Sequence, residues 1–137
     1  MKRVFVDSGG FFALLIREDA HHAHARELFA QAKADGWELV TTNVVVIETY
    51  ALLLNRSVQG RALAVRFLDW LDRVESTKRE RITEEDEGKA VALVRDHDDK
   101  TYSLCDALSF TVMERLGIRE AIAFDSDFRS YGRFTIL

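Results

Sequence analysis

The sequence lacks several features that mark other classes of protein. It contains no proline and a single cysteine, Cys105. An intramolecular disulfide is therefore excluded, and a lone thiol is typical of a reducing compartment. No apolar run approaches the roughly 20 residues that a membrane span requires. The basic residues 2–3 have no long apolar segment behind them, as a secretory signal would have. We expect a cytoplasmic protein without a membrane partner.

The chain also lacks an excess of basic charge. Its 137 residues include 19 Lys and Arg against 23 Asp and Glu, a formal net charge of −4. Because nonspecific nucleic-acid binding normally depends on surplus Lys and Arg, this balance argues against such a partner. At 47% apolar and 31% charged, the chain is too hydrophobic and too near neutral to be disordered. Its length suits one domain with a full core, and nothing divides residues 1–137.

Apolar patterning predicts an α/β fold. Short apolar runs at residues 4–6 and 121–124 each end at an aspartate and are typical of strands buried on both faces of a parallel sheet. Weaker strand candidates are residues 39–40, 79–82 and 134–136. Helical periodicity covers residues 8–16, 21–35, 43–55, 57–75, 83–97 and 103–117. Helices alternating with strands imply a three-layer sandwich around a mostly parallel sheet.

Polar residues mark the starts of three of these helices. Thr83 and Ser103 each stand three residues before an aspartate, the spacing of a capping box. Either Thr42 or Asn43 can cap the helix that carries Glu48. These signals strengthen the helix assignments and give the acids beside them an alternative, purely structural role.

Two aspartates, Asp7 and Asp125, follow the strongest strand candidates, and Asp127 comes two residues later. In open parallel sheets, ligand sites lie beyond the carboxyl ends of the strands. The structural alternative is that each aspartate only caps the helix that follows it. Placement at the same edge of the sheet favours a shared site.

Two further acids lie on predicted helices. Glu48 has apolar neighbours three and four residues away on both sides, so its carboxylate faces the core. Such burial costs several kcal/mol unless the group is protonated, paired or bound to a cation, and an arginine partner is one alternative. Asp106 lies in the first turn of its helix, where a capping-box role is the alternative.

Together these acids predict a hard-metal site. Carboxylates that converge repel one another unless a cation neutralises them. With only oxygen ligands and no Cys/His spacing suited to zinc, the expected ion is Mg²⁺ or Mn²⁺. Such an ion activates water and stabilises charge on a phosphate, so the expected reaction is phosphoester hydrolysis.

Several segments in this order resemble those of PIN-domain nucleases. They are Asp7 after the first strand, Glu48 in the helix after Thr41-Thr42-Asn43, the stretch YSLCDALSF at 102–110, LGI at 116–118 and FDSDF at 124–128. The resemblance spans essentially the whole chain. It implies a five-stranded parallel sheet of order 3-2-1-4-5 and a Mg²⁺- or Mn²⁺-dependent ribonuclease, commonly a VapC-type toxin of a toxin–antitoxin pair.

The resemblance also implies roles for individual residues. Asp7 and Asp106 would be the principal metal ligands. Glu48 and Asp125 would complete a catalytic set of four acids. Supporting roles fall to two residues: Ser8, through a hydrogen bond in the loop after the first strand, and Asp127, which is less central.

The chain departs from the family pattern at two positions. Ala123 stands where many members have Thr or Ser, and Cys105 stands where Thr is frequent. All four principal acids remain, so these departures concern fine tuning of the site.

The resemblance implies partners as well. They are RNA as substrate, a second copy of the chain in a homodimer, and a small DNA-binding antitoxin that inserts a segment into the active-site groove. Products would carry a 5′-phosphate and a 3′-hydroxyl. Arg56 and Arg61 are candidates for holding the RNA backbone at the rim of the site.

Other readings are weaker or remain open. His21, His22 and His24 are predicted to be a solvated helix start, because no carboxylate or cysteine stands at matching spacing. A haloacid-dehalogenase phosphatase would need a second aspartate where Gly9 stands. A solitary RNA-processing PIN nuclease, and a noncatalytic RNA- or partner-binding module with a degenerate site, remain alternatives.

The proposed site accounts for the acidic balance. Asp7, Glu48, Asp106, Asp125 and Asp127 together outweigh the net charge of −4, so the rest of the chain is close to neutral. Acidic composition therefore does not exclude RNA. It predicts instead that RNA binding depends on a bound divalent ion and a local basic rim.

Overall fold

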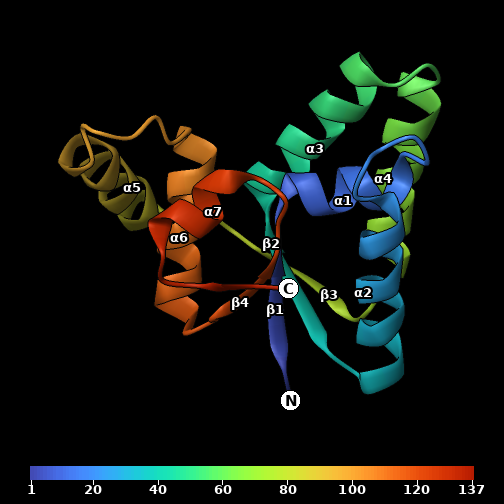
Figure 1. The fold of residues 1–137 in the computed structure, drawn as a ribbon, viewed down its shortest axis with the longest axis horizontal. Helices are drawn as coiled ribbons and strands as arrows, with labels where there is room; N and C mark the ends of the chain where they lie inside the picture. Colours follow the sequence, from blue (N-terminus) through green and yellow to red (C-terminus); the bar gives the residue numbers. More distant parts are fainter.

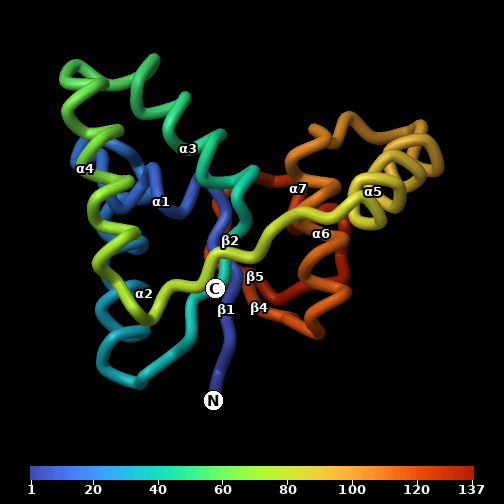
Figure 2. Tube along the Cα trace, turned by 180° about the vertical axis from the view of Figure 1, so that it is seen from behind, coloured from blue at the N-terminus to red at the C-terminus, as the bar shows by residue number.

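A five-stranded sheet runs through the middle of the molecule with helices on both faces (Figures 1 and 2). This computed structural model describes all residues 1–137. Every strand pair is parallel and the order is β3-β2-β1-β4-β5, which confirms the order that the family resemblance implied. The strands are β1 (Arg3–Val6), β2 (Glu38–Thr42), β3 (Thr77–Glu80), β4 (Glu120–Ile122) and β5 (Thr135–Ile136).

Seven helices complete the fold: α1 (Ser8–Leu15), α2 (His22–Asp35), α3 (Asn43–Arg56), α4 (Gly60–Arg73), α5 (Glu84–Asp96), α6 (Leu104–Leu116) and α7 (Ser126–Tyr131). In Figures 1 and 2, α2 and α4 lie on one side of the sheet and α5 and α6 on the other. The helices α1 and α3 start at the end of the sheet opposite the N-terminus, where β1 and β2 finish. None of the helices has the length and apolar character needed to cross a membrane.

The core surrounds the central strand β1, whose residues Val4, Phe5 and Val6 are fully buried. On one side Phe11 packs against Phe67 with ring centroids 5.1 Å apart. On the other side Phe110 of α6 lies 4.9 Å from Phe128 of α7 and stacks on Tyr131 at 4.3 Å. Burial on both faces explains why β1 is a continuous apolar run rather than an alternating one.

Predicted and observed elements differ most at β3. The strand candidate at 79–82 is wrong by two residues, since Leu39 pairs with Thr77 and Thr42 with Glu80. No residue of this edge strand is buried, so it carries no apolar run that would reveal it. The helix predicted over 57–75 begins only at Gly60 and ends at Arg73.

The predicted helix caps are present. Thr83 and Asp86 form a complete capping box at the start of α5. Between the alternatives for α3, Thr42 is the cap, because its hydroxyl accepts a hydrogen bond from the Val45 amide at 3.0 Å. Asn43 instead accepts a hydrogen bond from the Ile82 amide at 2.9 Å and so ties α3 to the end of β3.

Gly10 lets α1 lie directly against the sheet. A Cβ atom at this position would lie 2.8 Å from the Ile122 carbonyl oxygen, closer than real contacts allow. The first turn of α1, which follows Asp7, is therefore held against the end of β4.

We expect Gly10→Ala to lower the free energy of unfolding by about 1–3 kcal/mol, because the added methyl group forces α1 away from backbone atoms. Gly88→Ala is the matched control, since Gly88 lies in α5 with open space around it. There the same change should raise the free energy of unfolding by up to about 1 kcal/mol, through helix propensity alone. Urea unfolding of both variants tests the opposite signs. Equal effects would contradict the close packing of α1.

Candidate active site

All five acids singled out in the sequence line one cleft of about 440 Å³ at the carboxyl end of the sheet. Asp7 follows β1, and Asp125 and Asp127 follow β4. Glu48 comes from α3, and Asp106 comes from the first turn of α6. The sequence prediction that these residues share one edge of the sheet is confirmed by the geometry of the cleft.

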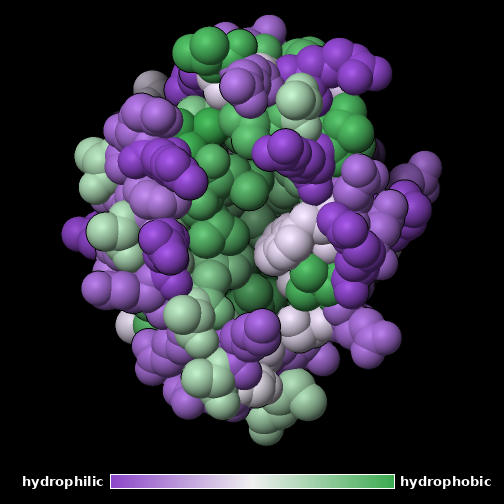
Figure 3. Space-filling view, turned by 90° about the vertical axis from the view of Figure 1, so that its right-hand side faces the viewer, coloured by the Kyte–Doolittle hydropathy of each residue, from purple (hydrophilic) through white to green (hydrophobic).

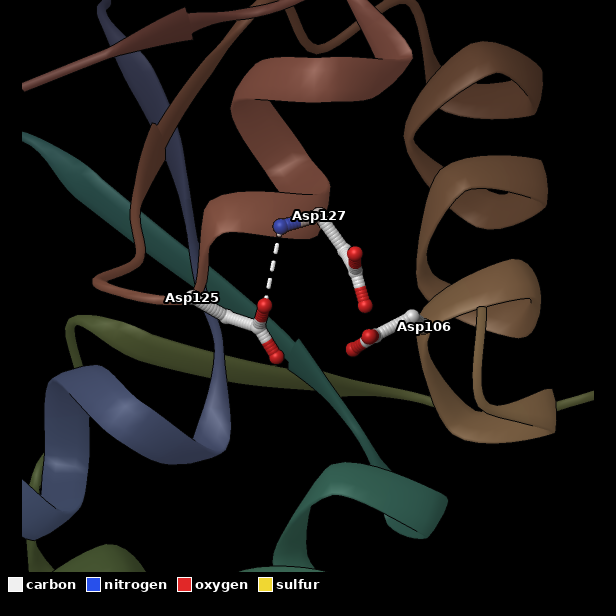
Figure 4. A group of neighbouring side chains, drawn as sticks. All are labelled: Asp106, Asp125 and Asp127. Atoms are coloured by element: carbon white, nitrogen blue, oxygen red, sulfur yellow. Dashed lines mark hydrogen bonds between the residues drawn. The ribbon is translucent and has the colours of Figure 1, made fainter. Parts of the chain in front are cut away.

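Asp106, Asp125 and Asp127 form the tightest group within the cleft (Figure 4). One carboxylate oxygen of each lies within 4.8 Å of the others. The Asp127 amide donates a hydrogen bond to Asp125 Oδ1 at 2.8 Å, which fixes the first turn of α7. Figure 4 shows the carboxylates of Asp106 and Asp127 facing each other across the gap between α6 and α7. Asp127 thus lies nearer the centre of the site than the sequence suggested.

Asp7 is the most deeply buried of these acids, with 2% of its surface exposed. Its Oδ1 atom is buried and has no hydrogen-bond partner. Asp7 occupies the cap position of α1, yet its side chain makes no capping hydrogen bond. The capping alternative is therefore wrong for Asp7, whereas Asp125 does cap α7. A buried oxygen without a donor is costly unless something absent from the protein chain satisfies it.

Glu48 is half-buried and takes part in no ion pair. Its Oε1 atom accepts a hydrogen bond from the hydroxyl of Ser8, the residue next to Asp7. The alternative of an arginine partner is therefore wrong. Ser8 lies where the sequence placed a supporting hydrogen bond, and it orients Glu48 toward the cleft.

A capping-box role does not account for the Asp106 carboxylate either. The Ser103 hydroxyl accepts a hydrogen bond from the Asp106 amide at 3.0 Å, so half of the predicted capping box is present. The Asp106 carboxylate does not return a bond to the Ser103 amide, unlike Asp86 in α5. The carboxylate is left facing the cleft with only 5% of the residue exposed.

Crowding and burial disfavour the charged state of both buried aspartates. Burial raises the pKa of Asp7 to about 7; the nearby Ser8 amide opposes this rise, and the charges of Glu48 and Asp125 add to it. Burial raises the pKa of Asp106 to about 8, with the charge of Asp7 as the next contribution. A divalent cation would remove this repulsion by stabilising the ionised carboxylates.

The chemistry of the donors fits a hard cation. The group formed by Asp106, Asp125 and Asp127 could hold an ion, and the unpartnered Asp7 oxygen lines the same cleft. All of these ligands are oxygens, the donors that Mg²⁺ and Mn²⁺ take. Burial, followed by the charges of Glu48 and Asp7, raises the pKa of the Cys105 thiol, so this residue stays protonated and offers no thiolate.

Two titratable residues that the sequence analysis did not assign to the site, Asp19 and His21, also line the cleft. The His21 ring stacks on Phe124 with centroids 4.5 Å apart and an interplanar angle of 4°. The prediction of a solvated helix start is confirmed, because His21 is exposed at the cap position of α2, but the sequence did not predict its place in the cleft. No local pattern signals the stack, since its two rings are about a hundred residues apart in the chain.

The neighbouring histidines His22 and His24 attach their helix to other parts of the chain. His22 Nδ1 lies 2.7 Å from the Ala13 carbonyl oxygen, and His24 Nε2 lies 3.2 Å from the Leu137 carbonyl oxygen. They attach α2 to α1 and to the end of the chain. Neither faces the acid cleft.

The two predicted RNA-contacting arginines are separated by the structure. Arg56, the last residue of α3, lines the cleft. Arg61 is exposed in the first turn of α4 and does not line the cleft, because the chain reverses between the two helices. The prediction for Arg61 as a residue at the rim is therefore wrong.

Without divalent ions, the site is expected to destabilise the protein as pH rises. A carboxyl group with a raised folded-state pKa binds its proton more tightly in the folded chain than in the unfolded one, so its contribution to stability declines from about pH 4 to about pH 7. Asp7→Asn removes this contribution and should raise the free energy of unfolding at pH 8 by roughly 1–3 kcal/mol relative to wild type. Urea unfolding in EDTA at pH 5 and pH 8 measures the difference.

Asp35→Asn, on the exposed end of α2, is the control and should change nothing at either pH. Added Mg²⁺ should stabilise wild type at pH 8 but not Asp7→Asn, because an ion that binds only the folded state stabilises it. A stability difference between Asp7→Asn and wild type that is the same at pH 5 and pH 8 would contradict the raised pKa.

Comparison with known proteins places this geometry in a family. The PIN domain family matches residues 4–133. The curated 23S rRNA-specific endonuclease VapC20 of Mycobacterium tuberculosis strain H37Rv is 35% identical over 130 residues, which cover 94% of each chain. The crystal structure of M. tuberculosis VapC20, described as a sarcin-ricin loop cleaving toxin, superposes with a TM-score of 0.85 at 34% identity over 95% of both chains.

More distant structures share the fold alone. A toxin–antitoxin complex from Klebsiella pneumoniae has a TM-score of 0.66 at 14% identity, over 96% of this chain and 95% of that one. VapBC2 from Rickettsia felis, bound to a DNA fragment from its promoter, has a TM-score of 0.67 at 9% identity, over 98% and 97% of the two chains.

Proposed function

Because this chain belongs to the PIN-domain family and is a homologue of VapC-type endoribonuclease toxins, we propose that it hydrolyses RNA with Mg²⁺ or Mn²⁺ held by its cleft acids. The observation that carries the proposal is the convergence of Asp7, Glu48, Asp106, Asp125 and Asp127 on one cleft, with a buried, unpartnered oxygen on Asp7. No Lys or Arg side chain neutralises the charge of these carboxylates, because none of them forms an ion pair.

Asp7 and Asp106 are the proposed principal ligands, because they are the two most buried acids of the cleft and because the charge of Asp7 raises the pKa of Asp106. Asp125 and Asp127 complete the set from the start of α7, where their oxygens meet that of Asp106. When bound there, a divalent ion supplies positive charge to the phosphate and lowers the pKa of a water molecule.

Side chains of the cleft carry out the proton transfer from the attacking water. Glu48 accepts a hydrogen bond from the Ser8 hydroxyl and lines the cleft, so its carboxylate can accept the proton of the attacking water. The water oxygen bonds to phosphorus as the bond to the 3′ oxygen breaks. The departing 3′ oxygen takes up a proton from solvent, which yields a 5′-phosphate and a 3′-hydroxyl. Because water is the nucleophile, the RNA 2′-hydroxyl takes no part in the reaction, and discrimination against DNA depends on contacts in the groove.

The proposed substrate is ribosomal RNA. The VapC20 relative is named for its action on 23S rRNA, and its crystal structure is described as that of a toxin that cleaves the sarcin-ricin loop. Identity of 35% along nearly the whole chain supports the same target here. A synthetic stem-loop with the sarcin-ricin sequence is therefore the first substrate to test.

A protein partner is also proposed, in the role of antitoxin. Figure 3 shows apolar side chains gathered in a hollow on the face that carries α2 and α4. This hollow has a volume of about 410 Å³, and its apolar lining includes Leu14, Phe29, Trp37, Trp70 and Val74. Apolar surface of this kind is typical of protein interfaces, and the toxin–antitoxin complexes among the similar structures support an antitoxin as the partner.

Asp7→Asn and Asp106→Asn should each reduce Mg²⁺-dependent cleavage of the stem-loop by roughly 100-fold or more, since each removes charge at the site of the ion. Circular dichroism should show an unchanged fold. Asp35→Asn is the control, because it makes the same change on the exposed end of α2. Cleavage by wild type in excess EDTA, or full activity of either site variant, would refute the proposal. Metal binding without turnover would favour the noncatalytic alternative.

A homodimer is proposed from exposed apolar residues on α3. Ile47 and Leu54 are 67% and 42% exposed, and a spacing of seven residues places them on one face of the helix. Sedimentation of wild type should give about twice the chain mass of 15.7 kDa. Ile47→Glu should shift the protein to the monomer, while Ala62→Glu on α4 should not. A monomeric wild type would contradict this assignment.

A further inference from the structure

A second hollow, of about 680 Å³, adjoins the acid cleft. It lies between the end of α1 with the loop after it and the turn from α3 into α4. Three arginines line it: Arg17 from the loop, Arg56 from the end of α3 and Arg66 from α4. Arg56 lines the acid cleft as well, so the two cavities share a wall.

None of these arginines has a partner in the protein. The ion pairs of the chain occupy other cations, including Arg79, Arg115 and Arg133, but not Arg17, Arg56 or Arg66. Glu18 is the single acid that lines the hollow. The hollow therefore carries a local positive charge in a protein whose net charge is −4. Guanidinium groups free of carboxylates are well suited to bind phosphates through paired hydrogen bonds.

The loop between α1 and α2 borders both cavities. Its residues Arg17 and Glu18 line the basic hollow, whereas Asp19 and His21 line the acid cleft. A polymer that extends from the acids past Arg56 therefore reaches Arg17 and Arg66 without leaving the protein surface. Leu15, Val58 and Leu63 add apolar surface to the same hollow, which sugars and bases can contact.

We propose that Arg17, Arg56 and Arg66 form a binding track for the phosphates of single-stranded RNA adjacent to the bond that is cleaved. The proposal rests on the function proposed above and adds the path by which the RNA enters or leaves the cleft. An acidic protein segment is the other ligand with suitable charge. RNA is favoured because the track is continuous with the acid cleft through Arg56, and because a nucleic-acid substrate must extend beyond the cleft.

The test compares Arg17→Gln/Arg66→Gln with a matched double variant, Arg26→Gln/Arg95→Gln, whose exposed arginines lie on α2 and α5. Two probes are used: the stem-loop with single-stranded flanks, and a trinucleotide that fills only the acid cleft. For the flanked RNA, the track variant should raise KM about 10-fold and leave kcat within about twofold, because phosphate contacts position the strand rather than react. Its KM for the trinucleotide, and both constants of the control variant, should be unchanged.

Binding supplies a readout that does not depend on turnover. Fluorescence anisotropy of the labelled, flanked RNA should show that the slope of log affinity against log salt becomes shallower by about 1.4 in the track variant, since each phosphate contact on a single strand contributes about 0.7. Arg17→Lys/Arg66→Lys retains the charges and should restore most of the slope. This measurement remains valid if wild type proves inactive, so failure of the proposed catalysis is distinguishable from failure of the track.

Unchanged KM and an unchanged salt slope in Arg17→Gln/Arg66→Gln would overturn the proposal and leave the hollow to an acidic protein segment. An equal loss of RNA affinity in Arg26→Gln/Arg95→Gln would also overturn it, because the effect would then reflect net charge alone.

Discussion

Mutual repulsion among buried carboxylates is the constraint on which the rest of this structure depends. Asp7 and Asp106 are both almost fully buried, and burial together with neighbouring charge raises their pKa values to about 7 and about 8. A site of this kind lowers stability at neutral pH, so the surrounding fold must offset the cost. The apolar core on both faces of β1, with Phe5 and Phe110 fully buried, supplies the rigidity that keeps the carboxylates together.

The same fold contains a buried acid with the opposite character. Asp86 of α5 is buried, but it accepts hydrogen bonds from Arg115 at 2.9 Å and from the Thr83 amide at 3.0 Å. Burial alone would raise its pKa, but these bonds hold the pKa of Asp86 below its usual value. Asp86 therefore joins α5 to α6 as a structural residue. Burial alone does not mark a functional acid; burial without a partner, as at Asp7, does.

Charge in this protein is separated over short distances. The acids lie in the cleft at the carboxyl end of the sheet, and unpaired arginines lie in the adjoining hollow, with Arg56 at the border between them. Net charge averages these regions and hides both. A chain with a charge of −4 can therefore present positive charge to a phosphate backbone beside a site that requires a cation.

By itself, the amino-acid sequence determined the buried strands, the helix caps and the acids of the cleft. Each depends on local pattern: apolar runs at β1 and β4, Thr83 three residues before Asp86, and an aspartate at the end of a strand. The bounds of edge strand β3 were not predicted correctly, because none of its residues is buried and the strand carries no apolar run.

Only the tertiary structure decided which distant side chains come together. His21 stacks on Phe124, Ser8 bonds to Glu48, and Arg17 and Arg66 line one hollow with Arg56 rather than Arg61. Local sequence encodes whether a residue faces the core. Which residues from distant parts of the chain become its neighbours is determined by the crossovers between parallel strands. The course of these crossovers depends on how the whole sheet and its helices pack.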